Sequence, residues 1–130
     1  MTDTTALVPT VLVVDDTSDN LKMISGLLRD RYRLKVANNG AKALEIAAGA
    51  VAPDLILLDI VMPGLDGYAV CERLKSDPRT KAIPVVFMTG RTEAGDRDRG
   101  LRLGAADYLT KPVDPAVLRE RVAAVLAREG

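Results

Sequence analysis

The sequence predicts an α/β protein whose parallel β-sheet is covered by helices on both faces. Segments typical of strands and segments typical of helices alternate five times along the chain, which is the pattern of a parallel sheet. Two of the strands, 11–14 and 55–58, are apolar at every position, so we expect both of their faces to be buried. Both run directly into aspartate, which places acidic side chains at one edge of the sheet.

The composition excludes several classes of function. The chain has 130 residues, of which 48% are hydrophobic and 28% charged, as in one globular domain. Its 18 basic and 18 acidic residues balance, so we expect no direct nucleic-acid binding. The start of the chain lacks a signal-peptide pattern, no apolar run approaches the roughly 20 residues of a membrane helix, and the single cysteine, Cys71, fits a reducing compartment. We therefore expect a cytoplasmic protein without a membrane segment.

The first half of the chain is expected to hold three strands and two helices. Apolar residues recur on one face of the first helix, and the second strand alternates apolar and charged residues, which is typical of a half-exposed edge strand. In order, we expect a flexible lead-in (1–9), followed by one domain (10–130) that begins with a strand (11–14), a helix capped at 17–19, an edge strand (34–36), a turn (38–40), an alanine-rich helix (41–49) and the strand at 55–58.

The second half is expected to hold two strands and three helices. In order, we expect a helix opened by residues 66–67 that stops before Pro78, a strand (83–88), a helix (92–103), a strand (105–109) and a last helix. The last helix has a clear start, with Asp114 as N-cap and Pro115 at its first position. Val113 and Leu118 stand where a hydrophobic staple would pair them.

Four of the five predicted strands end in a reactive polar side chain, and the exception is the edge strand. The residues are Asp15 with Asp16, Asp59, Thr89 and Lys111. In a three-layer, doubly wound sheet of the flavodoxin-like order 2-1-3-4-5, the crevice lies between strands one and three, so these side chains converge. Taken singly, each has a plain structural interpretation: a helix cap for the aspartates, a backbone-bonded hydroxyl for Thr89 and a solvated lysine. Their coincidence at one edge indicates a site.

A cluster of carboxylates needs a positive partner. Two carboxylates about 4 Å apart repel by roughly 4 kcal/mol at an effective dielectric constant near 20, and three need a cation or a shared proton. Because the chain has no histidine and no thiol near these positions, oxygen ligands favour Mg²⁺ or Mn²⁺. Lysine and hydroxyl groups beside such an ion suit phosphate oxygens, and an aspartate can accept a phosphoryl group.

Six short motifs follow one another along almost the whole chain. They are Val13-Val14-Asp15-Asp16, Leu57-Leu58-Asp59, Met62-Pro63-Gly64-Leu65-Asp66-Gly67, Met88-Thr89-Gly90, Gly104-Ala105-Ala106-Asp107-Tyr108 and Lys111-Pro112. In this order and spacing the pattern resembles the receiver domain of bacterial two-component response regulators, over about residues 10–128.

The resemblance implies a role for each residue of the cluster. Asp59 would be the phosphoacceptor, and Thr89 and Lys111 would bind the phosphoryl oxygens. The metal ligands would be Asp15 (through a water), Asp16, Asp59 and the backbone carbonyl of Val61. The Lys111-Pro112 bond would be cis, and the positions of Val61, Gly90 and Arg91 would tune the lifetime of the acyl phosphate.

The resemblance also implies a switch. Thr89 would move inward on phosphorylation, and Tyr108 would rotate in behind it, although plain half-buried packing also explains a tyrosine there. The face formed by the fourth helix, fifth strand and fifth helix would then change its preference for an output domain, a target protein or a second copy of the chain. Gly95 and Gly100 each cost about 1 kcal/mol relative to alanine, so we expect the fourth helix to be soft. Its charged segment 97–99 is expected to be solvated.

The main interpretation is a phosphorelay signalling module that phosphorylates and dephosphorylates itself and is not a turnover enzyme. Its donor would be a phosphohistidine of a histidine kinase or phosphotransfer protein, supplied in trans because this chain has no histidine. The alternative is a Mg²⁺-dependent phosphatase with an aspartyl nucleophile, resembling haloacid dehalogenase-type hydrolases, but the second acid of that family is replaced here by Val61. A degenerate receiver would have lost the acceptor or the lysine, and scarce aromatics disfavour a flavin site. The chain is either a free-standing protein or the receiver of a longer one.

Overall fold

The computed structural model describes the backbone of residues 8–90 and 94–129, and the side chains of these residues except 94–97 and 129. The expected lead-in therefore lies almost wholly outside the described residues. Within the described ranges, no helix combines the length and the apolar character needed to cross a membrane.

Five parallel strands form one sheet in the order β2-β1-β3-β4-β5, which confirms the predicted fold class and strand order. The strands are β1 (Thr10–Val14), β2 (Arg33–Ala37), β3 (Leu55–Asp59), β4 (Val85–Thr89) and β5 (Asp107–Thr110). β2 is an edge strand, as its alternating sequence predicts, and its Val36 is exposed.

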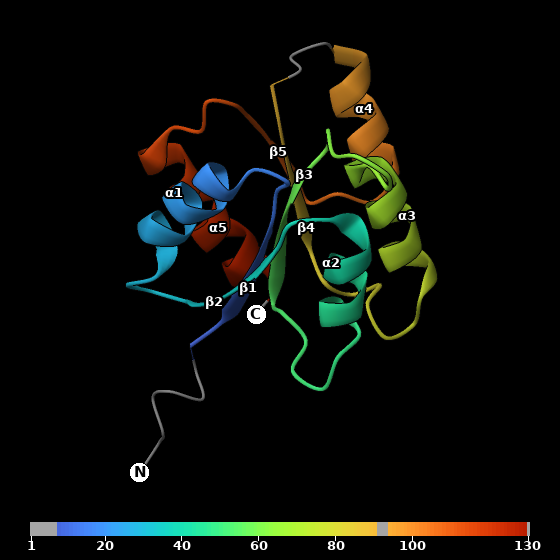
Figure 1. Ribbon diagram of the computed structural model, residues 1–130, viewed down its shortest axis with the longest axis horizontal. Coiled ribbons are helices and arrows are strands. Elements are labelled where there is room, and N and C mark those ends of the chain that lie inside the picture. Colours follow the sequence, from blue (N-terminus) through green and yellow to red (C-terminus); the bar gives the residue numbers. More distant parts are fainter. Residues whose placement is uncertain (1–7, 91–93, 130) are drawn as a thin grey trace.

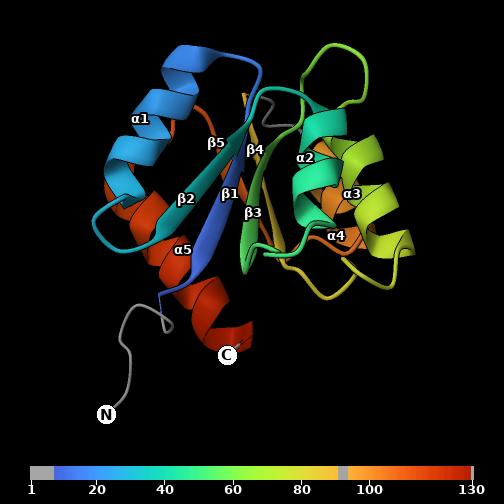
Figure 2. The ribbon, with the colours of Figure 1, turned by 60° about the horizontal axis from the view of Figure 1, so that its bottom comes forward.

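Helices cover both faces of the sheet and complete three layers (Figure 1). Helices α1 (Ser18–Leu28) and α5 (Pro115–Glu129) lie on one face, and α2 (Gly40–Ala47), α3 (Gly67–Ser76) and α4 (Ala94–Arg102) lie on the other. Figure 2 shows the same arrangement from another side, with the sheet between the two helical layers.

The two faces of the sheet bury separate apolar clusters. In β1, Leu12 and Val14 join the cluster that includes residues of α2 and α3, whereas Val11 and Val13 join the cluster that includes residues of α1 and α5. All four are fully buried. Since burial of one such side chain stabilises the fold by roughly 1.5–3 kcal/mol, this two-sided burial explains why the central strands are apolar at every position.

All three helices α1, α3 and α5 begin at the predicted positions, but a side-chain cap hydrogen bond forms only in α3 and α5. Asp66 accepts a hydrogen bond from the backbone N of Ala69 at 2.8 Å, and Asp114 accepts one from Ala116 at 2.9 Å. Thr17 occupies the N-cap position of α1, yet within the described residues its side chain makes no cap hydrogen bond. The predicted turn at 38–40 is itself a helix start, because Asn39 caps α2 by accepting from Lys42 N at 2.8 Å.

Several predicted boundaries are wrong by a few residues. β4 begins at Val85, not at residue 83, because Pro84 has no backbone N–H to donate to the sheet. β5 begins at Asp107, not at residue 105, because Ala105 still donates its N–H to the Gly100 carbonyl at the end of α4. α4 ends at Arg102 rather than at residue 103, and α2 at residue 47 rather than 49. The predicted start of the fourth helix, at residue 92, lies outside the described residues.

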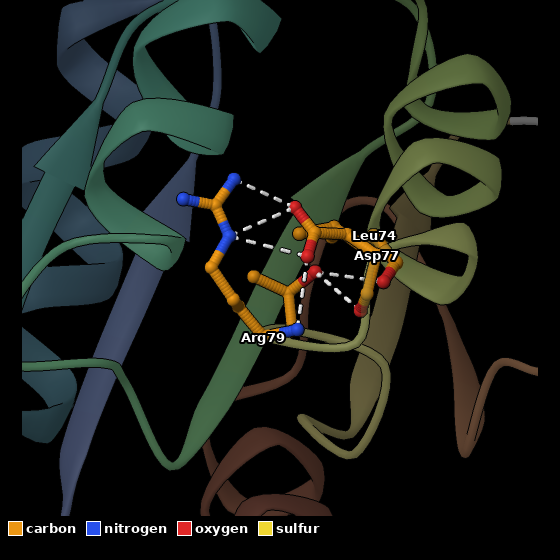
Figure 3. Close-up of polar contacts among 4 residues, drawn as sticks. Leu74, Asp77 and Arg79 are labelled. Atoms are coloured by element: carbon orange, nitrogen blue, oxygen red, sulfur yellow. Dashed lines mark hydrogen bonds and ion pairs between the residues drawn. The ribbon is translucent and has the colours of Figure 1, made fainter.

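The turn between α3 and β4 is fixed by local polar contacts (Figure 3). Arg79 Nη2 lies 2.9 Å from Asp77 Oδ2, and the Arg79 backbone N donates to Asp77 Oδ1 at 2.9 Å. The buried Thr80 hydroxyl donates to the Leu74 carbonyl at 2.7 Å. Because this turn precedes β4, it lies at the amino ends of the strands and leaves the opposite edge to the site.

Candidate functional site

The carboxyl ends of four strands meet at one edge of the sheet. Val14 of β1 pairs with Leu58 of β3, so Asp15 and Asp59 come one position later on neighbouring strands. Thr89 of β4 pairs with Thr110 of β5, and the backbone N of Lys111 donates to the Thr89 carbonyl at 2.7 Å. The register of the strands therefore brings the predicted residues to a common edge.

Lys111 contacts the acids of both central strands. Its Nζ lies 2.8 Å from Asp15 Oδ2 and 3.3 Å from Asp59 Oδ2. The peptide bond to Pro112 is cis, as the resemblance implied. The Lys111 side chain is 23% exposed, so it is solvated only in part.

Asp15 is fully buried and has a partner for each carboxylate oxygen. Its Oδ1 accepts from the backbone N of Thr17 at 2.9 Å, which satisfies a free N–H at the start of α1. Its Oδ2 accepts from Lys111 and from Asn20 Nδ2, the latter at 3.3 Å. Asp15 therefore both fixes the turn that leads into α1 and pairs with Lys111.

Asn20 was not singled out from the sequence. It stands in the first turns of α1, five residues after Asp15, and the only signal for its role is the polar side chain at the start of the helix that follows the acidic strand end.

Burial makes the negatively charged form of Asp59 less favourable. It is 4% exposed, and its Oδ1 accepts from the backbone N of Val61 at 3.4 Å. Burial raises the pKa of Asp59, Lys111 lowers it, the neighbouring Asp15 raises it, and the net pKa is raised. Burial works to lower the pKa of Lys111, but its hydrogen bonds and ion pairs with Asp15 and Asp59 outweigh this, so that pKa is also raised. The lysine therefore stays charged.

Three carboxylates form a compact set of oxygen ligands. One oxygen each from Asp15, Asp16 and Asp59 can be chosen so that all lie within 4.8 Å of one another. Two oxygens on opposite sides of Mg²⁺ are about 4.2 Å apart, at roughly 2.1 Å from the ion each, so this set fits Mg²⁺ with a small closure or with one carboxylate held through water. The hard oxygen donors and the excess negative charge suit a divalent ion of this kind.

Gly67 allows the first turn of α3 to pack directly on the site. A Cβ at this position would overlap the carbonyl oxygen of Asp59 and lie 2.7 Å from Ile60 Cα. The Gly67 backbone N donates to the Ile60 carbonyl at 2.8 Å. The glycine after Asp66 is therefore required by close approach of the helix to the backbone of the acidic strand end.

The remaining predicted site residues lie around this cluster. Thr89 is fully buried at the end of β4, and Val61 is 54% exposed in the loop after β3. Tyr108 is partly buried and packs on the cluster that contains Phe87. Gly90 is exposed next to Thr89, whereas Arg91 lies outside the described residues.

Asp98 and Arg99 are exposed, as expected of a solvated segment, and Arg99 in addition contacts α3. Its guanidinium carbon lies 4.2 Å from the centroid of the Tyr68 ring, so it stacks on α3 although the residue is exposed overall. The distance between two helices decides this contact, and a single sequence carries no signal for it.

The fold and the site define a doubly wound α/β protein with a cluster of three aspartates and a paired lysine, Lys111, at the carboxyl edge of its sheet. Residues 11–123 match the family model of the response regulator receiver domain, and the chain belongs to this family. It is therefore a receiver domain of two-component signalling, a family that takes phosphoryl groups from histidine kinases. This assignment does not favour the phosphatase alternative.

Named relatives of the chain differ in length. The chain is 47% identical over 113 residues to the response regulator PleD of Caulobacter vibrioides, and the match covers 86% of this chain and 25% of PleD. The chain thus spans a quarter of the length of that protein. It is 39% identical over 118 residues to protein PilH of Pseudomonas aeruginosa, covering 90% of this chain and 97% of PilH.

A solved structure supports the comparison of sites. The chain is similar to the receiver domain of a sensor histidine kinase from Pseudomonas aeruginosa, with a TM-score of 0.83 and 29% identity over 92% of this chain and 98% of that one. In that structure a magnesium ion is coordinated in the active site cleft.

Proposed function

We propose that Asp59 accepts a phosphoryl group from a phosphohistidine of a histidine kinase or a histidine phosphotransfer protein. The observation that carries the proposal is the meeting of Lys111 with Asp15 and Asp59, at 2.8 and 3.3 Å, beside the third carboxylate of Asp16. The phosphohistidine lies outside these 130 residues, because they contain no histidine.

The same residues would hold Mg²⁺, or Mn²⁺ in its place. The ligands would be Asp16 and Asp59 directly, Asp15 through a water, and the backbone carbonyl of Val61. When bound, the ion supplies positive charge between the carboxylates and the oxygens of the incoming phosphoryl group. Support comes from the three carboxylate oxygens within 4.8 Å of one another.

In the transfer, a carboxylate oxygen of Asp59 forms a bond to phosphorus while the bond from phosphorus to the donor imidazole nitrogen breaks. The electron pair of that bond returns to the imidazole, which can take a proton from water. Lys111 and the Thr89 hydroxyl bind the phosphoryl oxygens, so the chain contributes alignment and charge compensation rather than acid–base chemistry. Water later hydrolyses the acyl phosphate, and the module returns to its starting form without acting as a turnover enzyme.

The signal would leave through the face formed by α4, β5 and α5. Thr89 and Tyr108 serve as the switch, and the changed face contacts an output domain, a target protein or a second copy of the chain. The position of Tyr108 supports this role, because a Cβ added at Gly100 of α4 would lie 3.9 Å from Tyr108 Cδ2. Residues 10–130 form the receiver unit of this proposal, which operates in the cytoplasm.

Labelling of the acceptor tests the proposal. We expect incubation with a small phosphodonor such as phosphoramidate to add one phosphoryl group to the wild-type chain, measured by intact mass, only when Mg²⁺ is present. Asp59→Asn should remove the labelling, because the amide is not a nucleophile of comparable strength.

A matched control separates the acceptor from other acids at the same end of the fold. Asp19→Asn changes an exposed acid in the first turn of α1 and should leave the labelling unchanged. Labelling of Asp59→Asn to the wild-type extent would overturn the assignment of the acceptor.

A further inference from the structure

Arg99 of α4 rests on an aromatic pair that belongs to other elements. Its guanidinium carbon lies 4.2 Å from the centroid of Tyr68, a residue of α3 that is only 3% exposed. The Tyr68 ring in turn meets Phe87 of β4 edge to face, with centroids 5.4 Å apart and an interplanar angle of 64°. One charged side chain of α4 is thereby tied to α3 and, through it, to the central sheet.

The next residue, Gly100, brings α4 close to the sheet. A Cβ at this position would lie 2.9 and 3.0 Å from Phe87 Cδ2 and Cε2, closer than packing allows, and 3.9 Å from Tyr108 Cδ2. Arg99 and Gly100 therefore place this turn of α4 against three aromatic residues at once.

Tyr68 is also anchored to the backbone that carries Asp59. It directly follows Gly67, whose N–H donates to the Ile60 carbonyl at 2.8 Å and where an added Cβ would overlap the carbonyl oxygen of Asp59. Arg99 and Tyr68 both line a cavity of about 150 Å³ beside this loop. The contact thus joins α4 to the loop that leaves the acceptor, and the cavity gives the arginine room to leave the ring.

We propose that Arg99 is a positioning residue that sets the switching equilibrium of this receiver. Its contact with Tyr68 stabilises the position of α4 that accompanies the ion pair between Lys111 and Asp59, and so opposes phosphorylation. The inference rests on the proposed function, because it takes Tyr108 as the moving aromatic. A rotation of Tyr108 displaces the neighbouring Gly100, and with it Arg99, from the Tyr68 ring.

A contact made in only one of two states shifts their equilibrium by its full strength. A guanidinium at an exposed site loses its attraction to a ring beyond about 6 Å from the centroid, and the attraction corresponds to roughly a two- to fivefold change in an equilibrium constant. Removal of Arg99 should therefore favour the activated arrangement by about that factor.

The test is a titration with beryllium trifluoride in the presence of Mg²⁺, followed by NMR. Beryllium trifluoride binds a carboxylate as a stable stand-in for a phosphoryl group, so its apparent affinity reports the switching equilibrium. We expect Arg99→Ala to bind it about two- to fivefold more tightly than the wild type. Arg102→Ala removes the same charge from an exposed site on the same helix and should match the wild type.

Two variants of Tyr68 test whether the effect of Arg99→Ala depends on the aromatic ring. In Tyr68→Phe, which keeps an aromatic face, Arg99→Ala should still tighten binding. In Tyr68→Leu it should not. Arg99→Met, which keeps the apolar stem and removes the charge, should behave as Arg99→Ala, and this variant decides the matter if Tyr68→Leu does not fold.

The outcomes separate the two proposals. A wild-type chain that fails to bind beryllium trifluoride with Mg²⁺ would overturn the proposed function and this inference with it. A wild type that binds, with Arg99→Ala equal to Arg102→Ala or Arg99→Met equal to the wild type, would overturn the role of Arg99 alone.

Discussion

Asp59 is held in a place that disfavours its own negative charge. Its pKa is raised by burial and by Asp15 more than Lys111 lowers it. The folded chain therefore binds a proton at Asp59 more readily than the unfolded chain does. The ionised carboxylate costs stability at every pH above the raised pKa, and this cost disappears as the pH falls below the unfolded value near 3.8. Such a cost is expected where a nucleophile is kept available for reaction.

A neutral side chain in place of Asp59, the proposed acceptor, should stabilise the fold. Without added divalent ions, we expect Asp59→Asn to raise the free energy of unfolding near neutral pH by about 1 kcal/mol, the usual size of a single-site effect. The gain should shrink as the pH falls through the raised pKa of Asp59, and it should vanish below the unfolded value near 3.8, where the carboxyl is protonated in both states. Urea unfolding in the presence of a chelator, at both pH values, measures the difference.

Glu72→Gln provides the control, because this exposed acid of α3 should change the free energy of unfolding by less than about 0.5 kcal/mol at either pH. An Asp59→Asn variant less stable than the wild type near neutral pH would mean that the pair with Lys111 outweighs the burial of the carboxylate.

At the same scale, the sequence predicts some site residues and not others for a physical reason. Asp15, Asp59 and Lys111 end parallel strands, and the sheet register alone brings them together. Asn20 and Arg99 reach their partners because of the way the helices are rotated and spaced on the sheet. Rotation and spacing depend on the packing of many side chains, so they leave no local pattern in the sequence.

At the scale of elements, α4 lies close to the sheet because Gly100 has no side chain. The sequence suggested that glycine makes this helix soft, and that softness stays a prediction. The structure adds a second role for Gly100, which is buried and leaves room for the ring of the fully buried Phe87.

The same substitution at two helical glycines should have opposite effects. We expect Gly100→Ala to destabilise the fold by about 1–2 kcal/mol, because the added Cβ would meet Phe87 at 2.9 Å and the strain exceeds the gain in helix propensity. Gly26→Ala in α1 should stabilise it by about 0.5–1 kcal/mol, because among the described residues no heavy atom outside its own turn lies within 4 Å of the new Cβ. Thermal and urea unfolding measure both. Equal changes in the free energy of unfolding at the two sites would show that α4 accommodates the added Cβ without strain.

Helix starts were more predictable than strand starts, because caps are local. Asp66 and Asp114 bond to backbone groups two or three residues later, so their sequence positions suffice. The first residue of β4 or β5 depends on which carbonyl of another element accepts the hydrogen bond from each backbone N–H of the strand. The bond from Ala105 to Gly100 at the end of α4 could not be foreseen from alternation of apolar residues.

At the scale of the whole molecule, the sequence predicts the architecture well because each central strand packs against both helical layers. Alternate residues of β1 and β3 feed two apolar clusters, so a run that is apolar at every position implies helices on both faces. The carboxyl ends of β1 and β3 bring Asp15, Asp16 and Asp59 together, and the fold therefore concentrates negative charge at this edge of the sheet.

We expect that concentration of charge to make the stability of the whole chain depend on a divalent ion. If Mg²⁺ binds the folded carboxylate cluster and not the dispersed aspartates of the unfolded chain, a concentration ten times the dissociation constant should raise the free energy of unfolding by about 1.4 kcal/mol and the melting temperature by a few degrees. Asp16→Asn should remove most of this gain. Asp16 is exposed, so the variant should fold normally without the ion. Asp19→Asn, a nearby exposed acid outside the carboxylate cluster, should keep the full response to Mg²⁺. Thermal melts of the three proteins across a Mg²⁺ series measure the effect. An Asp16→Asn variant that responds as strongly as the wild type would place the ion away from the three carboxylates, and the charge gathered by the fold would then need another partner.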